Sequence, residues 1–177
     1  LSKKIYYSPN FKRHSCEVDY VDFKNKIKNS LNASVKKMMV ADVDVGCFLS
    51  GGVDSSLVAF LMQKNSKKKN KTFTVGFDEK QYDESSYANT IARSLKTNHH
   101  EIIVNSNDMF MHLDSLINIF DEPFSDSSFI PTYLISKLAS SHVKVVLSGD
   151  GGDEIFLGYN RYLFAKKITK FKKNCPN

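Results

Sequence analysis

The 177-residue chain contains no tryptophan, only four prolines and only three cysteines. Cys16, Cys47 and Cys175 form no C-x-x-C pair and have no histidine at metal-ligand spacing, so we expect neither a disulfide framework nor structural zinc. No apolar run approaches the roughly 20 residues of a membrane span, and nothing near the start looks like a signal peptide. We therefore predict a cytoplasmic protein with no membrane partner.

The composition is that of one globular domain, with 41% hydrophobic, 25% charged and 12% aromatic residues and a mean hydropathy of −0.34. The 25 basic and 19 acidic residues give a formal net charge of +6, which admits nucleic acid as a partner. Much of the excess of basic residues lies in the runs 67–71 and 161–173. Neither run is interleaved with aromatic residues in the way that a surface that stacks nucleic acid bases would be. We expect solvated basic faces and no nucleic acid partner.

Short β-branched or apolar runs alternate with longer segments of helical periodicity. Strands are predicted at 43–49, 72–77, 101–104 and 143–147, and helices at 23–38, 57–63, 84–95, 108–120 and 130–138, with Pro123 and Pro131 bounding a loop. This alternation predicts an α/β fold with a parallel sheet and helices on both of its faces. Ligands bind such sheets at the carboxyl ends of the strands, so the site is expected after Leu49, Phe77 and Leu147.

The first of these positions carries the sequence SGGVDSS at residues 50–56, between a predicted strand and a predicted helix. Two glycines allow the backbone amides to approach a ligand closely, and the following helix begins with unpaired N–H groups that favour an anion. Asp54 would repel a bare phosphate, so its presence predicts a divalent cation between carboxylate and phosphate. The alternative is an ordinary strand-to-helix turn with a serine-rich cap.

The sequence SGDGGDE follows the last predicted strand, at residues 148–154. Its carboxylates would converge on the first loop, where Asp54 and Asp153 could together hold Mg²⁺. A simple Gly/Asp turn between strand and helix is the alternative for this segment.

Residues 50–56 resemble the PP-loop of the ATP pyrophosphatases, and further blocks follow in order at 72–78, 82–85, 99–101, 121–124, 130–133 and 148–154. This succession, from about Asp19 to Tyr162, is similar to the synthetase domain of glutamine-hydrolysing asparagine synthetases. The resemblance implies an adenine nucleotide alpha hydrolase-like fold. It also implies that residues 1–18 are a linker or the end of a preceding segment, and that 19–177 are a C-terminally incomplete synthetase domain without its amidotransferase domain.

The resemblance further implies that ATP and Mg²⁺ are bound and that a carboxylate, by default aspartate, is adenylated with release of pyrophosphate. Ammonia from a glutaminase domain would then displace AMP to give asparagine, and a homodimer is one expected assembly. Asp54 and Asp153 match the magnesium ligands, and Asp150 matches an acidic catalytic position that is often glutamate in the family. The implied nucleotide contacts are Leu49, Ser50, Gly51, Gly52, Asp54, Ser55, Ser56, Val75, Gly76, Ser148 and Gly149.

Other interpretations stay open. The chain could be a nucleotide-binding module without turnover, could amidate another acid such as a sugar acid, or could be an RNA-modifying PP-loop enzyme. The lysine that the family uses beyond Tyr162 is not assigned, because nothing in the spacing of Lys166, Lys167 and Lys170 identifies it. The histidine pair at positions 99 and 100 is expected to be structural rather than catalytic.

Overall fold

The computed structural model describes residues 2–8, 19–81, 83–105, 111–119, 122, 126 and 128–174. The strands are β1 (Val45–Phe48), β2 (Lys71–Phe77), β3 (Asn98–Val104) and β4 (Val145–Leu147). The helices are α1 (Tyr20–Met38), α2 (Val53–Asn65), α3 (Ser85–Leu95), α5 (Leu113–Ile117), α6 (Phe129–Ser140), α7 (Gly152–Phe156) and α8 (Asn160–Asn174).

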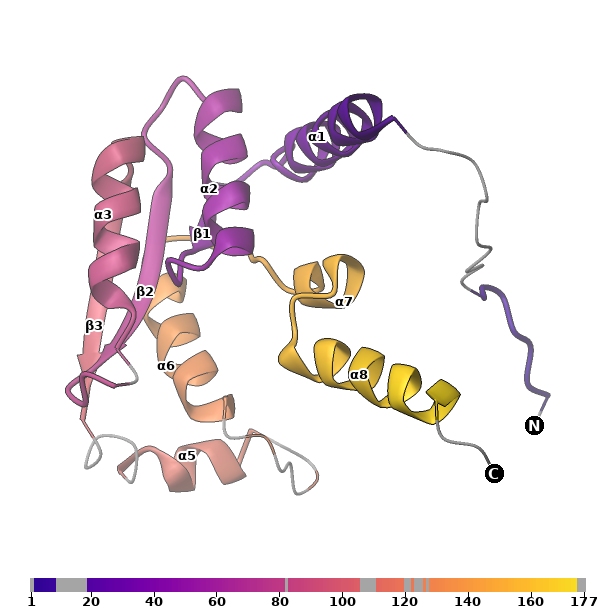
Figure 1. Cartoon of the computed structure of the whole chain (residues 1–177). Helices are drawn as coiled ribbons and strands as arrows, with labels where there is room; N and C mark the ends of the chain where they lie inside the picture. Colours follow the sequence, from indigo (N-terminus) through magenta and orange to yellow (C-terminus); the bar gives the residue numbers. More distant parts are fainter. Residues whose placement is uncertain are drawn as a thin grey trace.

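The four strands form one parallel sheet, as the sequence predicted. Their order is β3-β2-β1-β4, and Figure 1 labels the first three of them. Cys47 on the central strand β1 pairs with Thr72 of β2 on one side and with Leu147 of β4 on the other. The chain builds β1, β2 and β3 outward in one direction and then returns to place β4 on the opposite side of β1. The order of the strands therefore reverses between β1 and β4.

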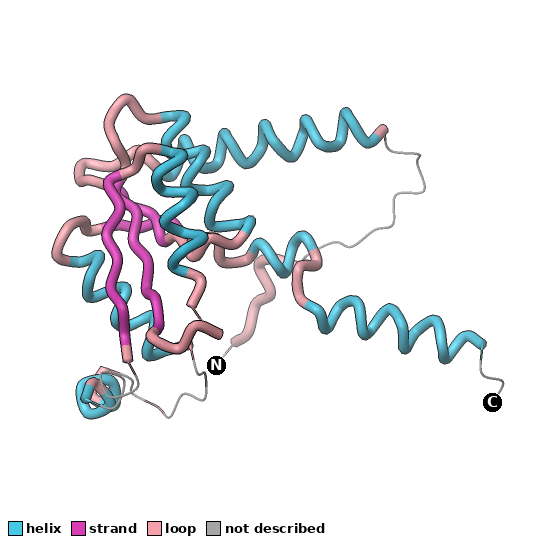
Figure 2. The backbone as a smooth tube through the Cα atoms, turned by 60° about the vertical axis from the view of Figure 1, so that its left-hand side comes forward, coloured by secondary structure: helices cyan, strands magenta, loops and turns pink. Residues whose placement is uncertain are grey.

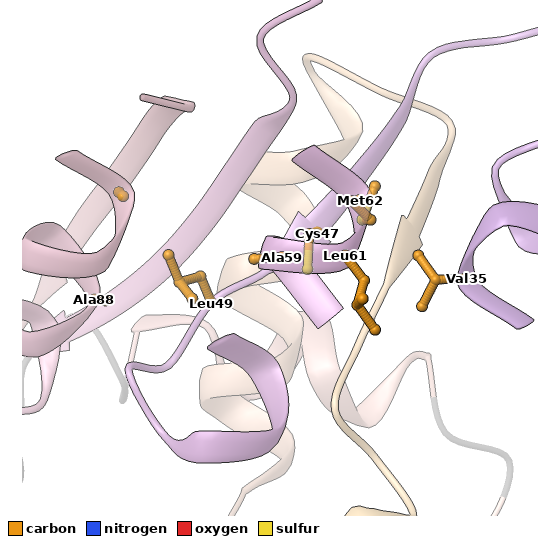
Figure 3. Packing of buried hydrophobic residues seen from close by; sticks show 8 residues of the cluster. Val35, Cys47, Leu49, Ala59, Leu61, Met62 and Ala88 are labelled. Atoms are coloured by element: carbon orange, nitrogen blue, oxygen red, sulfur yellow. The ribbon is translucent and has the colours of Figure 1, made fainter. Parts of the chain in front are cut away.

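Helices cover both faces of the sheet, which confirms the predicted layers. Cys47 and Leu49 project to one face and pack with α1, α2 and α3 in a cluster that includes Ala59, Met62 and Ala88 (Figure 3). Phe48 and Phe73 project to the other face and pack against α6. Side chains alternate between the faces of a strand, so β1 and β4 each supply both cores. Full burial of a leucine such as Leu49 stabilises the fold by about 1.5–3 kcal/mol.

Several parts of the fold differ from the prediction. Helix α2 begins at Val53, four residues before the predicted start, and β3 begins at Asn98, three residues before its predicted start. Helix α6 begins at Phe129, so Pro131 lies in its first turn, where a proline is tolerated because the N–H of that position has no helical acceptor. Helix α5 covers Leu113–Ile117 within the predicted segment 108–120, of which 108–110 and 120 lie outside the described residues. Helices α7 and α8 were not predicted.

Several sequence predictions concern residues outside the described part of the chain. These are the loop boundary at Pro123, the block residues Tyr82, Asp121 and Phe124, the cysteines Cys16 and Cys175, and most of the segment 1–18.

Helices α1 and α8 extend away from the sheet on the same side of the molecule (Figure 2). The apolar stripe predicted on α1 is buried only near its C-terminal end, where Val35 packs against α2, whereas Phe23 is 51% exposed. Within the described residues, no helix has both the length and the apolar character that crossing a membrane would require.

Candidate nucleotide-binding site

A cavity of about 660 Å³ lies at the carboxyl ends of β1 and β4, where the strand order reverses. The loop after β1 forms one wall through Ser50 and residues 52–55, and the loop after β4 forms another through residues 148–150, 152 and 153. Helix α6 contributes Thr132 and Ile135. The two glycine-rich loops therefore meet across one cavity, as their positions after Leu49 and Leu147 predicted.

The loop after β1 is held in a fixed shape by glycine and serine. Gly51 has φ +88, a left-handed backbone conformation that favours glycine, and a Cβ built on it would lie 2.7 Å from Tyr87 Cβ. The Ser55 hydroxyl accepts from the Ser50 N–H at 3.2 Å and lies 2.9 Å from the Ser50 hydroxyl. The Ser56 hydroxyl donates to the Gly52 carbonyl at 2.6 Å. The serines thus close the loop on itself.

The N-terminus of α2 faces the cavity with Gly52 as its cap, and no side chain among the described residues caps it. The first N–H groups of a helix have no acceptor within the helix, and the helix dipole makes this end positive. Gly149 of the second loop packs against this turn so closely that a Cβ on it would lie 2.7 Å from the Ser55 nitrogen. The arrangement is that of an anion site.

Three carboxylates share the cavity with these amides. Asp54 and Asp153 are both half-buried, and a Cβ built on Gly152 would lie 2.5 Å from Asp54 Oδ2. Asp150 is exposed and accepts a hydrogen bond from the Ser148 hydroxyl at 2.8 Å. None of the described lining residues is a lysine or arginine, so an anion that binds beside these carboxylates needs a cation with it.

The donor set fits Mg²⁺, which takes oxygen ligands and uses one or two carboxylates together with phosphate and water. The described residues contain no group of three or more His, Cys, Asp or Glu side chains arranged to hold a metal. Asp54 and Asp153 could therefore hold the ion only if a ligand supplied the remaining oxygens.

The asparagine synthase family model matches residues 26–176. The chain belongs to this family. It is 44% identical over 151 residues to a putative glutamine-hydrolysing asparagine synthetase 2 from Methanocaldococcus jannaschii, covering 81% of this chain and 29% of the relative. It is 34% identical over 173 residues to the glutamine-hydrolysing asparagine synthetase 1 from Bacillus subtilis. This match covers 98% of this chain and 27% of the relative. The chain thus spans less than a third of the length of these relatives.

Two solved structures share the fold of this asparagine synthase family chain at 20% sequence identity. The NH3-dependent NAD synthetase of Campylobacter jejuni has a TM-score of 0.53 and covers 77% of this chain and 60% of its own. The NMN synthetase of Francisella tularensis has a TM-score of 0.51, and the match covers 81% of this chain and 59% of the synthetase chain. The predicted fold class, a parallel sheet with helices on both faces of the adenine nucleotide alpha hydrolase-like type, is confirmed.

Some predicted site residues of this family member do not line the cavity, namely Leu49, Gly51, Ser56, Val75 and Gly76. The Leu49 N–H donates to the Phe73 carbonyl at 2.8 Å, and the Leu49 carbonyl accepts from the Thr74 hydroxyl. Leu49 is fully buried, so its proposed contact with a nucleoside stays a prediction. Val75 and Gly76 lie toward the carboxyl end of β2, and their role stays a prediction.

The cavity is also lined by Phe48, Thr132, Ile135 and Phe156, for which no sequence pattern predicted a role in the site. Thr132 falls in one of the family blocks, and Phe48 precedes the first loop directly. Their contribution depends on how α6 and α7 lie across the carboxyl end of the sheet, which periodicity along the chain does not reveal.

The histidine pair lies at the opposite end of the sheet, at the start of β3. His99 Nδ1 lies 2.9 Å from the Thr72 hydroxyl oxygen. The centroid of the His100 ring lies 3.9 Å from that of the His142 ring. The Nε2 atoms of His99 and His100 are buried and have no hydrogen-bond partner among the described residues. Burial lowers the pKa of both imidazoles, and the charges of His142 and Lys71 lower the pKa of His100 further. The two histidines therefore do not line the cavity.

Proposed function

We propose that this chain is the nucleotide-binding part of an ATP-dependent, amide-forming ligase of asparagine synthetase type. The observation that carries the proposal is the meeting of the two loops: within the described residues, a helix N-terminus without a side-chain cap and three carboxylates line one cavity that has no basic side chain. Such a cavity suits a polyphosphate bound together with Mg²⁺. The relatives' names identify glutamine-hydrolysing asparagine synthetases, which makes aspartate the default acid.

The residues that line the cavity would have separate roles in adenylation and in the step that follows it. The amides at the N-terminus of α2 and the Ser50 hydroxyl would hold the β- and γ-phosphates, which leave as pyrophosphate when the substrate carboxylate attacks the α-phosphorus. Asp54 and Asp153 would hold Mg²⁺, which neutralises negative charge on the phosphates when bound. Asp150, at the exposed rim of the cavity, would accept a proton from ammonia as it attacks the acyl-adenylate and AMP departs.

The remaining assignments belong to the same proposal. Leu49, Val75 and Gly76 would contact the nucleoside, and Ser148 and Gly149 would contact ATP from the second loop. Ammonia would come from glutamine through a glutaminase domain, and a homodimer is the assembly that we propose for the whole protein.

One observation favours a second function, nucleotide binding without turnover. The described residues that line the cavity include no lysine or arginine to stabilise the reacting phosphate. The family lysine is expected beyond Tyr162, where Asn160–Asn174 form α8, a helix that extends away from the sheet (Figure 2).

Two measurements separate these functions. Binding of Mg·ATP by calorimetry should weaken at least about tenfold in Asp54→Asn, which corresponds to ~1.4 kcal/mol. Asp22→Asn in the first turn of α1 is the matched control, and its affinity should stay unchanged. Exchange of labelled pyrophosphate into ATP that requires aspartate would support the ligase. Binding without exchange for any carboxylate would support the binding module, and no binding of Mg·ATP by the wild type would contradict both.

A further inference from the structure

One carboxylate outside the cavity joins the end of β2 to the start of α3. Asp83 Oδ1 accepts from the N–H of Phe77, the last residue of β2, at 3.3 Å. The same oxygen accepts from the N–H of Ser85, the first residue of α3, at 3.1 Å, and Oδ2 accepts from the Ser85 hydroxyl at 3.1 Å. These bonds hold the first turn of α3 against the carboxyl end of β2, and they lower the pKa of Asp83.

Packing makes this junction tight. Gly76 lies beneath it, and a Cβ built there would lie 2.9 Å from Asp83 Oδ1, 2.9 Å from Ser85 Cβ and 2.6 Å from Ile103 Cδ1. Ser85 is buried, although its side chain is polar. Gly76 therefore leaves no room for a side chain here, and Asp83, Ser85 and Ile103 pack directly on the backbone of β2.

The first turn of α3 in turn supports the PP-loop. A Cβ built on Gly51 would lie 2.7 Å from Tyr87 Cβ and 2.8 Å from the Ala88 nitrogen, so the α3 backbone is in direct contact with Gly51. Tyr87 and Ala88 both donate their N–H groups to the Glu84 carbonyl, which keeps this turn helical. Gly51 therefore packs against helix α3 in its left-handed conformation.

We propose that Asp83 is a positioning residue for the nucleotide site: by fixing α3 to β2, it sets the place of Gly51 and the direction of the amides that follow. Asp83 touches no ligand in this scheme. The effect on nucleotide affinity rests on the proposed function, whereas the effect on the loop itself does not. A displacement of about 1 Å at a reacting or binding group can change rates about 100-fold, so a small shift of α3 is enough.

The experiment compares Asp83→Ala with Asp19→Ala by hydrogen exchange and by Mg·ATP binding. Asp19 caps α1 in a similar way, accepting from Val21 N–H at 2.7 Å and Asp22 N–H at 3.2 Å, far from the loop in sequence. We expect amide exchange in residues 51–56 to rise about tenfold or more in Asp83→Ala and to stay unchanged in Asp19→Ala. The Kd for Mg·ATP should rise about 10- to 100-fold in Asp83→Ala alone.

A conservative variant keeps the test decisive if Asp83→Ala does not fold. Asp83→Asn retains an oxygen that can accept from Phe77 and Ser85 but loses the charge, so its exchange should lie between those of the wild type and Asp83→Ala. Faster exchange confined to α3 and β2, with residues 51–56 unchanged, would overturn the inference. A wild type that binds no ATP would contradict the proposed function, while the exchange data would still decide the role of Asp83.

Discussion

The carboxylate of Asp54 rests directly on Gly152, because a Cβ built on Gly152 would lie 2.5 Å from both Asp54 Cγ and Asp54 Oδ2. We therefore expect Gly152→Ala to displace Asp54 and to weaken Mg·ATP binding at least about tenfold, as measured by calorimetry. Gly151 is a matched control, since a Cβ there meets nothing within 4 Å. Its φ of +87 makes Gly151→Ala costly by about 1–2 kcal/mol in stability, with a smaller effect on affinity than Gly152→Ala. Equal losses of affinity in the two variants would contradict this explanation.

Acidification should destabilise the protein through the histidines of β3. Burial lowers the pKa of His99 and His100 in the folded state below their ordinary value of 6.5, while the nearby Glu101 opposes this shift at His99. Below that value the unfolded chain binds more protons than the folded chain, so the free energy of unfolding falls as the pH decreases through 6.5. Urea unfolding at about pH 7.5 and about pH 5 measures the difference.

His100→Phe tests the origin of that pH dependence. The ring can still stack on Phe73, whose centroid lies 5.4 Å from that of His100, and the substitution removes a buried Nε2 without a partner. The loss of stability between the two pH values should shrink in this variant. A loss equal to that of the wild type would show that other groups cause it.

The Cys47 thiol should be inert in the folded protein. It is buried on β1, and burial raises its pKa to about 12, so almost no thiolate forms at neutral pH. In the double variant Cys16→Ser and Cys175→Ser, a disulfide exchange reagent should label no thiol in the native state and one thiol in urea. Rapid labelling of the native variant would mean that β1 opens readily.

Truncation of Phe73 should destabilise the fold. The side chain is 0% exposed and packs with Ala139 and Val143 beneath α6. Phe73→Ala should lower the free energy of unfolding by about 3–5 kcal/mol in urea titrations. Phe60→Ala on α2 is the control, because Phe60 is 45% exposed and its truncation should cost less than about 1.5 kcal/mol. Similar losses in both variants would contradict the assigned core.

Much of this fold could be predicted because local patterns report on it directly. The β-branched and apolar runs identified all four described strands, although β3 begins at Asn98 rather than Glu101. His99 and His100 pair with Thr72 and Phe73, but polar residues at a strand end give no apolar signal. Periodicity also identified α1. It did not show that only the C-terminal part of the apolar stripe on α1 packs against α2. The basic composition of residues 160–174 concealed α8.

The meeting of the two glycine-rich loops could be predicted for a similar reason. Parallel strands bring their carboxyl ends to one edge, so loops after β1 and β4 had to converge. Thr132 could not be found in this way, because its place depends on how α6 crosses the sheet. The link from Asp83 to Gly51 depends on contacts between β2, α3 and the loop, which no single segment encodes.

The pairing of β1 with β4 has a consequence for how the protein is made. Val45 pairs with Val145, one hundred positions later in the chain, and closing so long a loop costs roughly 4 kcal/mol in conformational entropy. The ribosome must synthesise the chain through residue 154 before the two glycine-rich loops can meet. Strands β1, β2 and β3 are consecutive in sequence, so they can pair earlier. The cavity can therefore form only after these three strands have been synthesised.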